Sequence, residues 1–335
     1  MRLVIVADTH FSSKTTEREL EVFDSIIEDA ASADALIICG DLFDSPLPSS
    51  TMVYRLLSWF QQLFYKNIDV FIIPGNHDIS NCGNALDYLA FRNSLYVFRE
   101  PTIVELKDHK LGFLPYSRTK FENSSDWNPE IIFYHGLIES AQISKFFRFT
   151  TGDEVLSKDS VSKLMGDCKY FIAGDVHLHQ RIETGDDKWI GYVGTPWQHN
   201  FGEEGYDTGY LVIEDGNLVH LGTLGTTHLT RSVSSLEEGQ RVLSQVKDSP
   251  NPIRLRFQVS ETLGLAERKI LKRLGGDYEI DVCFKEEVEY ADKIPVVNKE
   301  VTIDELLPIF GTWLDVATSD KGMKEMAMER AKELI

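Results

Sequence analysis

Short apolar runs alternate with helical patterns through the N-terminal half of the chain. Leu3 to Ala7, Ala35 to Cys39 and Ile68 to Ile73 are apolar runs of the length expected for buried strands. Between them, apolar residues recur at helical spacing from Leu20 to Ala30 and from Met52 to Phe64. This alternation predicts an α/β fold in which strands are buried between helices.

Further apolar runs predict more strands downstream. They are Tyr96–Phe98, Ile103–Leu106, Leu111–Leu114, Ile131–Tyr134, Tyr170–Ala173, Trp189–Val193 and Tyr210–Ile213. The sequence Asp215-Gly216-Asn217 is typical of a hairpin turn, so we expect the later strands to pair antiparallel.

The pattern changes near residue 232. A helix-like segment, a Pro-flanked break and two strand-like runs, Ile253 to Val259 and Tyr278 to Phe284, predict a small α+β domain. A capping box at Thr302-x-x-Glu305 then opens a helical stretch. We therefore expect a large α/β domain at 1–232, a small capping domain at 233–297 and C-terminal helices at 298–335.

Composition indicates a soluble protein of a reducing compartment. The first apolar run is too short for a signal peptide, and none elsewhere approaches the roughly 18 residues that span a bilayer. The 4 cysteines are scattered, with no C-x-x-C pair, which favours free thiols and a cytoplasmic location and argues against a thiolate zinc site.

The formal net charge of -19 limits the ways in which the chain can hold nucleic acid. Binding to a phosphate backbone normally uses a basic face. If the chain binds nucleic acid, metal ions, a local basic patch or a partner subunit must offset this charge.

Polar clusters follow five predicted strands directly. They are Asp8-x-His10, Gly40-Asp41-x-x-Asp44, Gly75-Asn76-His77-Asp78, His135 and Gly174-Asp175-Val176-His177. The carboxyl ends of strands are where α/β sheets bind ligands, so we expect these side chains to meet at one edge. Glycines before Asp41, Asn76 and Asp175 permit a sharp turn there.

The residue types in these clusters suit a pair of divalent metal ions. Imidazole nitrogen with carboxylate and amide oxygen, and no thiolate, is the ligand set of borderline or hard ions. Two ions about 3.5–4 Å apart can activate a water for attack on phosphorus. His77 would donate a proton to the leaving oxygen, with Asp78 as its orienting partner.

These motifs resemble those of the calcineurin-like metallophosphoesterases. D-T-H, G-D-L-F-D, G-N-H-D, Y-H-G and G-D-V-H occur in this order. Within that superfamily the chain resembles the SbcD-type nuclease subunits, especially their bacteriophage branch, through G-D-L-F-D, Gly194-Thr195-Pro196-Trp197 and Gly202-Glu203-Glu204. The resemblance implies a two-sheet sandwich flanked by helices, with a capping domain and C-terminal helices.

The resemblance also implies a ligand set. One ion would be held by Asp8, His10, Asp41 and His177, and the other by Asp41, Asn76, His135 and Asp175. The family motif usually reads G-H-x-H, and this chain has Asp175 at the first position. Asp175 can ligate through oxygen, or a register shift can bring in His179 instead. The oxygen-rich set favours manganese, with magnesium as the alternative.

The implied function is a metal-dependent DNA exonuclease or endonuclease subunit in DNA end processing, recombination and repair. The implied partners are DNA, an SbcC-like coiled-coil ATPase and a second copy of the chain, in the cytoplasm or a host's cytoplasm. Two other functions share these residues: a phosphatase or phosphodiesterase acting on nucleotides or phosphoproteins, and a non-catalytic scaffold with a decayed site.

Four residues are candidate substrate contacts, and each has a structural alternative. Asp44 could instead cap a helix, and Thr195 could simply shape a tight loop. Lys145 and Arg148 lie among aromatics, a composition that can stack bases and meet phosphates or can belong to a core. Isolated histidines are more often structural than ligating, and this applies to His109, His199, His220 and His228. The apolar face of the C-terminal helices is expected to pack on the chain itself or to dock on the ATPase.

Overall fold

The computed structural model describes residues 1–80, 83–89, 94–117, 127–144, 147–148, 155–182, 188–246, 251–259 and 279–284. The chain divides into two compact units, Met1–Gln258 with Leu263–Val282, and Val259–Thr262 with Cys283–Ile335. Lys145 and the predicted C-terminal helices at 298–335 lie outside the described residues.

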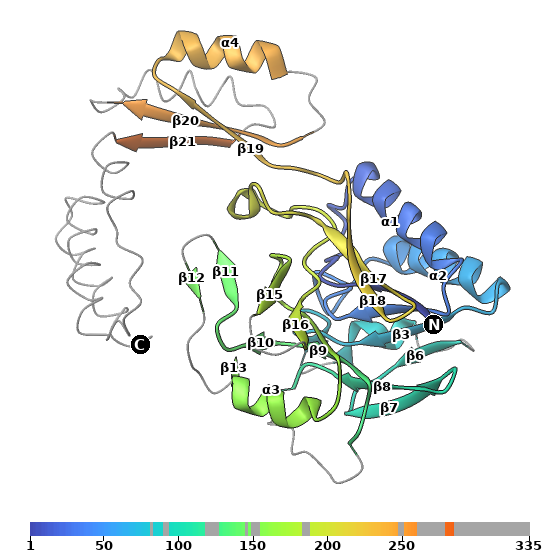
Figure 1. Ribbon diagram of the computed structural model, residues 1–335. Helices are drawn as coiled ribbons and strands as arrows, with labels where there is room; N and C mark the ends of the chain where they lie inside the picture. The colour runs from blue at the N-terminus through green and yellow to red at the C-terminus, as the bar shows by residue number, and fades with distance from the viewer. Residues whose placement is uncertain are drawn as a thin grey trace. The chain divides into compact units, whose positions relative to one another are not determined.

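A six-stranded mixed sheet forms the first half of the main domain (Figure 1). In spatial order its strands are β18 (Asn217–Gly222), β17 (Gly209–Glu214), β1 (Arg2–Val6), β2 (Ala35–Cys39), β3 (Asp69–Ile73) and β6 (Leu95–Val97). β1, β2, β3 and β6 run parallel, whereas β17 pairs antiparallel with β1 and with β18. The predicted hairpin at Asp215-Gly216-Asn217 is therefore confirmed.

The second six-stranded sheet is also mixed. Its strands in order are β15 (Gln180–Ile182), β16 (Trp189–Tyr192), β14 (Tyr170–Gly174), β9 (Ile131–His135), β8 (His109–Leu114) and β7 (Thr102–Leu106). The four central strands are parallel, and the two edge strands are antiparallel to their neighbours.

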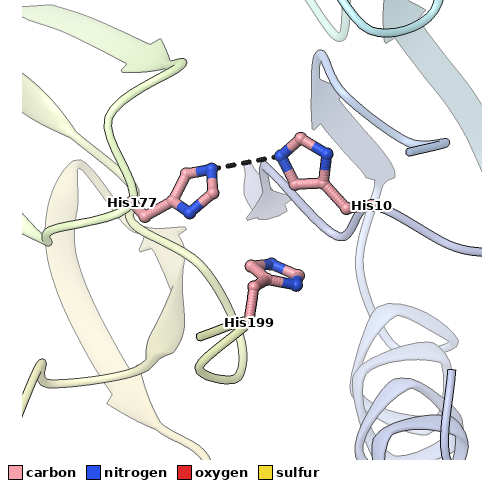
Figure 2. Close-up of side chains that lie close together, drawn as sticks. All are labelled: His10, His177 and His199. Carbon is pink, nitrogen blue, oxygen red and sulfur yellow. Dashed lines mark hydrogen bonds between the residues drawn. The ribbon is translucent and has the colours of Figure 1, made fainter. Parts of the chain in front are cut away.

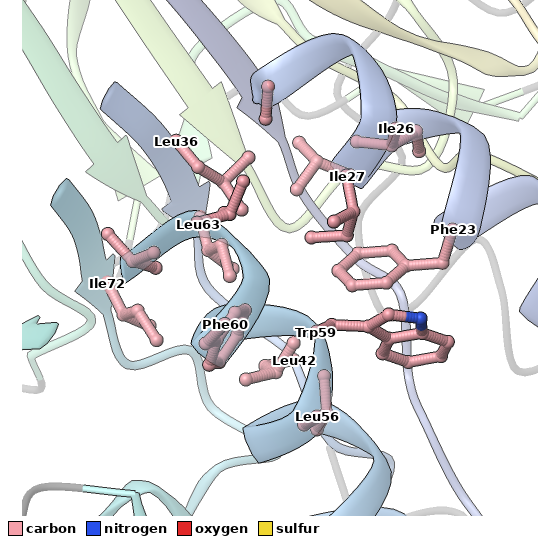
Figure 3. Packing of buried hydrophobic residues seen from close by; sticks show 14 of the residues in the cluster. Phe23, Ile26, Ile27, Leu36, Leu42, Leu56, Trp59, Phe60, Leu63 and Ile72 are labelled. Carbon is pink, nitrogen blue, oxygen red and sulfur yellow. The ribbon is translucent and has the colours of Figure 1, made fainter. Parts of the chain in front are cut away.

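The two sheets pack face to face, and helices cover their outer faces. Alternate residues of each strand point to opposite faces, so Val4 and Leu36 meet the helices α1 (Glu17–Ala30) and α2 (Ser50–Tyr65), as Figure 3 shows for Leu36. Ile5 and Ile37 face the second sheet instead. The short helix α3 (Lys158–Met165) contributes to the cluster on the outer face of the second sheet. The predicted two-sheet α/β sandwich flanked by helices is confirmed.

Helix α3 is an element that the sequence pattern did not predict. Its 8 residues bury only Val161, Leu164 and Met165. Eight residues are fewer than the window in which helical periodicity becomes evident. By contrast, α1 begins at Glu17 and is preceded by the N-cap Thr16, whose capping box with Glu19 fixes the first turn.

Residues beyond the main sandwich form a three-stranded sheet of β19 (Leu229–Val233), β20 (Ile253–Val259) and β21 (Glu279–Phe284). β19 and β20 are parallel and are joined through helix α4 (Leu236–Val246). The predicted strands at Ile253–Val259 and near Tyr278–Phe284 are present, and the division into a capping domain at 233–297 stays a prediction.

Several short elements complete the described structure. They are β4 (Ile79–Ser80), β5 (Gly83–Asn84), β10 (Leu137–Ile138), β11 (Gln142–Ser144), β12 (Phe147–Arg148), β13 (Val155–Leu156), and the 3-10 turns η1 (Ala85–Tyr88) and η2 (Phe201–Glu203). Within the described ranges, no helix combines the length and apolar character needed to cross a bilayer.

Candidate metal centre

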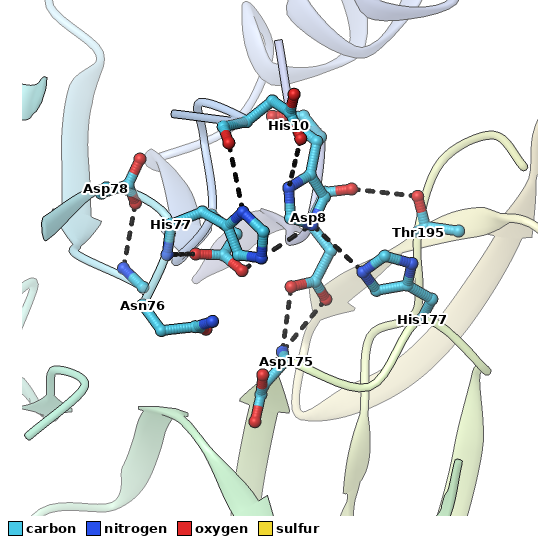
Figure 4. Close-up of polar contacts among 12 residues, drawn as sticks. Asp8, His10, Asn76, His77, Asp78, Asp175, His177 and Thr195 are labelled. Atoms are coloured by element: carbon cyan, nitrogen blue, oxygen red, sulfur yellow. Dashed lines mark hydrogen bonds and ion pairs between the residues drawn. The ribbon is translucent and has the colours of Figure 1, made fainter. Parts of the chain in front are cut away.

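The polar clusters meet at the carboxyl ends of strands from both sheets. Asp8 and Asp41 follow β1 and β2, and Asn76 follows β3 in the first sheet. In the second sheet, His135 is the last residue of β9 and Asp175 follows β14. The centre therefore lies between the two sheets, as Figure 4 shows for the residues it labels. Parallel strands end at the same edge of a sheet, which is why residues so distant in sequence converge.

One group of ligand atoms surrounds His10. Its Nε2 lies 3.1 Å from Nε2 of His177 and 3.7 Å from Oδ2 of Asp41 (Figure 2 shows the two rings). The Nδ1 of His177 donates a hydrogen bond to Oε1 of Glu203 at 2.9 Å, because a carboxylate only accepts. The Nε2 of His177 is thereby turned toward His10 and can ligate.

A second group surrounds His135. Its Nε2 lies 3.2 Å from Oδ1 of Asn76, 3.5 Å from Oδ2 of Asp41 and 3.9 Å from Oδ1 of Asp175. Its Nδ1 donates to the carbonyl oxygen of Cys39 at 2.8 Å, which leaves Nε2 for ligation. Oδ2 of Asp41 faces both groups and is placed as a bridge.

The chemistry of these atoms fits a pair of divalent cations. Imidazole nitrogens and carboxylate or amide oxygens point at one another, and without positive charge between them such acceptors repel. Nδ1 of His10 is buried and has no hydrogen-bond partner among the described residues. Asp8, Asp41 and His135 also form a compact set able to hold an ion. The structure therefore brings members of the predicted ligand set together, but it places Asp8 with Asp41 and His135, across the two predicted groups.

The pKa shifts show how strongly the centre attracts positive charge. Burial lowers the pKa of His135, but the charge of Asp41 and of its acidic neighbours outweighs burial and raises that pKa to about 10. Burial likewise opposes the protonation of His177, yet the hydrogen bond to Glu203 and the charge of Asp8 raise its pKa to about 9. Burial raises the pKa of Asp8 to about 7. Acidic neighbours therefore stabilise positive charge on the rings of His135 and His177.

The backbone at the centre is strained at the ligands themselves. Asp8, His10, Asp41 and Asp175 have φ angles of 53°, 45°, 48° and 99°. Side-chain-bearing residues rarely adopt this left-handed region, and such strain concentrates at functional sites. It aims each side chain into the space between the sheets.

The glycines that precede the ligands serve two different purposes. Gly40 has a φ of +84°, so the predicted sharp turn is present there. Gly75 and Gly174 have no such angle; a Cβ would lie 2.1 Å from Oδ1 of Asp41 at Gly75 and 2.1 Å from the carbonyl oxygen of Cys39 at Gly174. These two glycines are required for space rather than for the turn.

His77 lies exposed at the mouth of the centre. Its Nδ1 donates to the carbonyl oxygen of Asp44 at 3.1 Å, and its backbone N–H donates to Oδ1 of Asp41 at 2.8 Å. Its ring meets that of His10 edge to face at 4.7 Å. Nε2 is left to exchange a proton with a substrate, as a general acid requires.

Asp78 has a different role from the predicted one. Its buried carboxylate accepts hydrogen bonds from the backbone N–H groups of Leu42, Phe43 and Gly75 at 3.3, 3.0 and 2.9 Å. Burial raises its pKa to about 6. Asp78 thus holds two loops together, and the Asp44 carbonyl orients His77 in its place.

The four candidate substrate contacts differ in their exposure to solvent and in whether the structure describes their side chains. Thr195 is fully buried, and its Oγ1 lies 2.8 Å from the carbonyl oxygen of Trp197 and 3.0 Å from that of Asp8. A contact between Thr195 and substrate is therefore ruled out in this arrangement. Asp44 is exposed, with Oδ1 at 3.9 Å from Nδ1 of His10, and stays a candidate. Lys145 lies outside the described residues, and Arg148 is described only through its backbone in β12.

The structure brings Asp175 to the second group and gives His179 another environment. Nδ1 of His179 lies 2.9 Å from the carbonyl oxygen of Tyr192, and its ring stacks on that of His220 at 3.9 Å. This placement favours the reading in which Asp175, through oxygen, takes the position of the family's imidazole.

Two residues at the centre were not predicted as part of it. His199, expected to be structural, has its ring 5.0 Å from that of His10 and 5.1 Å from that of His177. Glu203 is buried and holds the His177 ring. Glu203 belongs to the noted Gly202-Glu203-Glu204 motif, which was a usable signal, whereas His199 had no signal in the sequence apart from lying between two noted motifs.

Comparison with known proteins agrees with this geometry. The model of the calcineurin-like phosphoesterase family matches residues 1–192. The chain belongs to that family. Calcineurin-like phosphoesterases typically bind two divalent metal ions, and the His and Asp groups described above are placed to do so.

Within the family, the chain is distantly related to DNA double-strand break repair proteins named Mre11. It is 23% identical to that of Methanosarcina mazei over 271 residues, 75% of this chain and 42% of the relative. It is 22% identical to that of Methanosarcina acetivorans over 337 residues, 92% of this chain and 52% of the relative. It is 29% identical to that of Methanopyrus kandleri over 234 residues, 58% of this chain and 49% of the relative. The chain spans about half the length of these relatives, and a bacteriophage branch stays a prediction.

Proposed function

We propose that this calcineurin-like phosphoesterase is a metal-dependent DNA nuclease subunit that hydrolyses phosphodiester bonds during DNA end processing, recombination and repair. The observation that carries the proposal is the extent of the similarity. The family model stops at residue 192, whereas the alignment with the repair protein of Methanosarcina acetivorans covers 92% of the chain. A relationship through the phosphoesterase core alone would not extend so far.

Seven residues would hold two divalent ions, most favourably manganese and alternatively magnesium. Asp8, His10 and His177 would hold one ion, Asn76, His135 and Asp175 the other, and Asp41 would bridge. A bound pair of divalent ions supplies an activated water and neutralises charge on the attacked phosphorus centre. The protein itself holds the ligand side chains in fixed positions at the ends of rigid strands.

His77 acts on the leaving group. With Nδ1–H held by the Asp44 carbonyl, protonated Nε2 gives its proton to the oxygen released when the P–O bond breaks. The neutral ring then recovers a proton from solvent, to which it is exposed. Both exonuclease and endonuclease cleavage are compatible with this role.

The test is a nuclease assay on an end-labelled DNA duplex with manganese, comparing the wild type with His77→Ala. General acid catalysis contributes about 10²–10⁴-fold, so we expect a loss in that range with two ions still bound. His109→Ala is the matched control, because His109, on strand β8, is half-buried and its Nδ1 lies 2.8 Å from Oε2 of Glu130. It should cleave like the wild type.

The same protein preparations separate the other two functions. Faster turnover of a phosphomonoester or a small phosphodiester than of the duplex would favour a phosphatase or phosphodiesterase acting on nucleotides or phosphoproteins. A wild-type protein that neither binds metal nor cleaves the duplex would favour a scaffold and contradict the proposal. Full cleavage by His77→Ala would contradict the role of His77 as the proton donor.

The proposal includes three partners: DNA, an SbcC-like coiled-coil ATPase and a second copy of the chain. Because the net charge is -19, the chain needs another source of positive charge to bind DNA, and an ATPase subunit would supply part of it. The segment 298–335 is the candidate docking site for that subunit.

A further inference from the structure

The segment from Thr195 to Glu203 lies against the candidate metal centre without contributing any residue to the ligand set inferred above. His199 belongs to this segment, and its ring is close to those of His10 and His177. Figure 2 shows the three imidazoles around one space. One ligand atom of each lies within 4.8 Å of the others.

The hydrogen bonds of His199 determine which of its nitrogens is available. Nε2 lies 2.9 Å from the carbonyl oxygen of Asp8. A carbonyl oxygen only accepts, so Nε2 carries the proton and donates it. The Oγ1 of Thr195, 2.8 Å from Nε2, can direct its own proton to the Trp197 carbonyl. Nδ1 of His199 therefore carries a lone pair, and one ring nitrogen in Figure 2 faces the gap between His10 and His177.

The segment is held in this position by a buried carboxylate. Oε2 of Glu203 accepts the backbone N–H of His199 at 2.7 Å, while Oε1 accepts the ring N–H of His177 at 2.9 Å. The same side chain thus positions both imidazoles, and His199 is preorganised rather than loosely placed.

We propose that His199 is a further metal ligand, completing a nitrogen-rich side of the centre with His10 and His177. The inference rests on the proposed metal-dependent function. Metal–nitrogen distances of about 2.0–2.1 Å put opposite ligand atoms about 4.2 Å apart, so small ring movements bring all three into range. The two ion positions are then unlike: one is rich in imidazole, and the other is rich in oxygen from Asn76 and Asp175. Imidazole-rich sites favour later transition ions, and oxygen-rich sites favour magnesium or manganese.

Titration calorimetry of the purified chain with manganese chloride tests this inference. His199→Ala should lower the affinity for one ion by roughly tenfold or more, since even the loss of an outer-shell partner costs about 10–100-fold. The second ion should bind as before. His109→Ala, which removes a half-buried imidazole that belongs to none of the candidate metal-binding groups, should match the wild type in both steps.

Two further variants separate ligation from a structural role. His199→Asn places an amide oxygen near the position of Nδ1 and should recover part of the affinity. His199→Gln places an amide N–H near Nε2, retains the bond to the Asp8 carbonyl and should bind like His199→Ala. Substitution with cobalt(II) gives a spectroscopic readout, because its visible absorption changes when a nitrogen ligand is lost.

Wild-type affinity in His199→Ala, or full recovery by His199→Gln with none by His199→Asn, would overturn the assignment of His199. If the wild type binds two ions in the same titrations, the proposed metal-dependent function stands whether or not His199 is a ligand. A wild-type chain that binds no ion would overturn the proposed function, and His199 as a ligand with it.

Discussion

Asp41 shows at the scale of one residue how the centre works. Its Oδ2 lies between the two imidazole groups, 3.7 Å from Nε2 of His10 and 3.5 Å from Nε2 of His135. Burial opposes its ionisation, yet the charge of His135 and a hydrogen bond with that ring hold the pKa of Asp41 well below its usual range. The Asp41 carboxylate, the proposed bridge between two ions, is therefore ionised in the folded protein at neutral pH.

Glu203 offers the sharpest residue-level prediction. Glu203→Ala removes the acceptor that holds the His177 ring and the backbone of His199, so manganese affinity should fall about 10–100-fold in calorimetric titration. Glu203→Gln keeps an acceptor oxygen and should lose less. Glu105→Ala changes an exposed glutamate on β7 and serves as the control. Equal losses in Glu203→Gln and Glu203→Ala would contradict an orienting role.

At the scale of elements, the ends of β14 and β2 come close enough to exclude a side chain. A Cβ at Gly174 would lie 2.1 Å from the Cys39 carbonyl oxygen, the same atom that accepts Nδ1 of His135. The two sheets thus meet through backbone at the point where the ligands emerge. This close approach sets the spacing between the ligands of the first sheet and those of the second.

Gly174→Ala should disturb both the packing and the centre. Relief of the clash requires a backbone shift, and overpacking of this kind costs about 1–3 kcal/mol of unfolding free energy. Chemical denaturation and manganese titration would measure the two effects. Gly222→Ala is the matched control, because its Cβ would meet only the Thr208 carbonyl oxygen at 3.9 Å. If Gly174→Ala changed neither the free energy of unfolding nor the affinity for manganese, the close approach of β14 and β2 would not set the spacing of the ligands.

The whole molecule is acidic, and the DNA proposed as its substrate is acidic as well. The sequence has 53 acidic residues and 34 lysines and arginines. Long-range attraction to DNA is therefore expected to be weak, and under the proposed function metal ions and a partner subunit would have to supply it.

We expect duplex cleavage by the isolated chain in manganese to be slow and to fall steeply between about 50 and 200 mM salt. An SbcC-like ATPase subunit should raise the rate and reduce the salt dependence. The rate of hydrolysis of a small phosphodiester, measured in parallel, should change little with salt, because this substrate does not require binding to a DNA backbone. A duplex cleavage rate that the ATPase subunit leaves unchanged would count against the proposed partnership.

The sequence by itself determined the long strands and helices of the main domain and the ligand candidates. Uninterrupted apolar runs such as Leu3 to Ala7 identify strands buried on both faces, since only such strands lack alternation. Polar motifs that directly follow those runs, such as Asp8-x-His10, must lie at strand ends. These are local properties, and they suffice for the α/β class and for the first description of the centre.

Only the tertiary structure decided what each side chain contacts. Asp78 and His77 are adjacent in sequence, yet the Asp78 carboxylate binds backbone N–H groups of another loop. Thr195 was a candidate substrate contact and is fully buried, and His199 was expected to be structural and lies at the centre. The space around Gly174 is likewise set by Cys39, a residue of the other sheet. These contacts join segments far apart in the chain, so their geometry depends on how the two sheets pack and is not encoded in any local pattern.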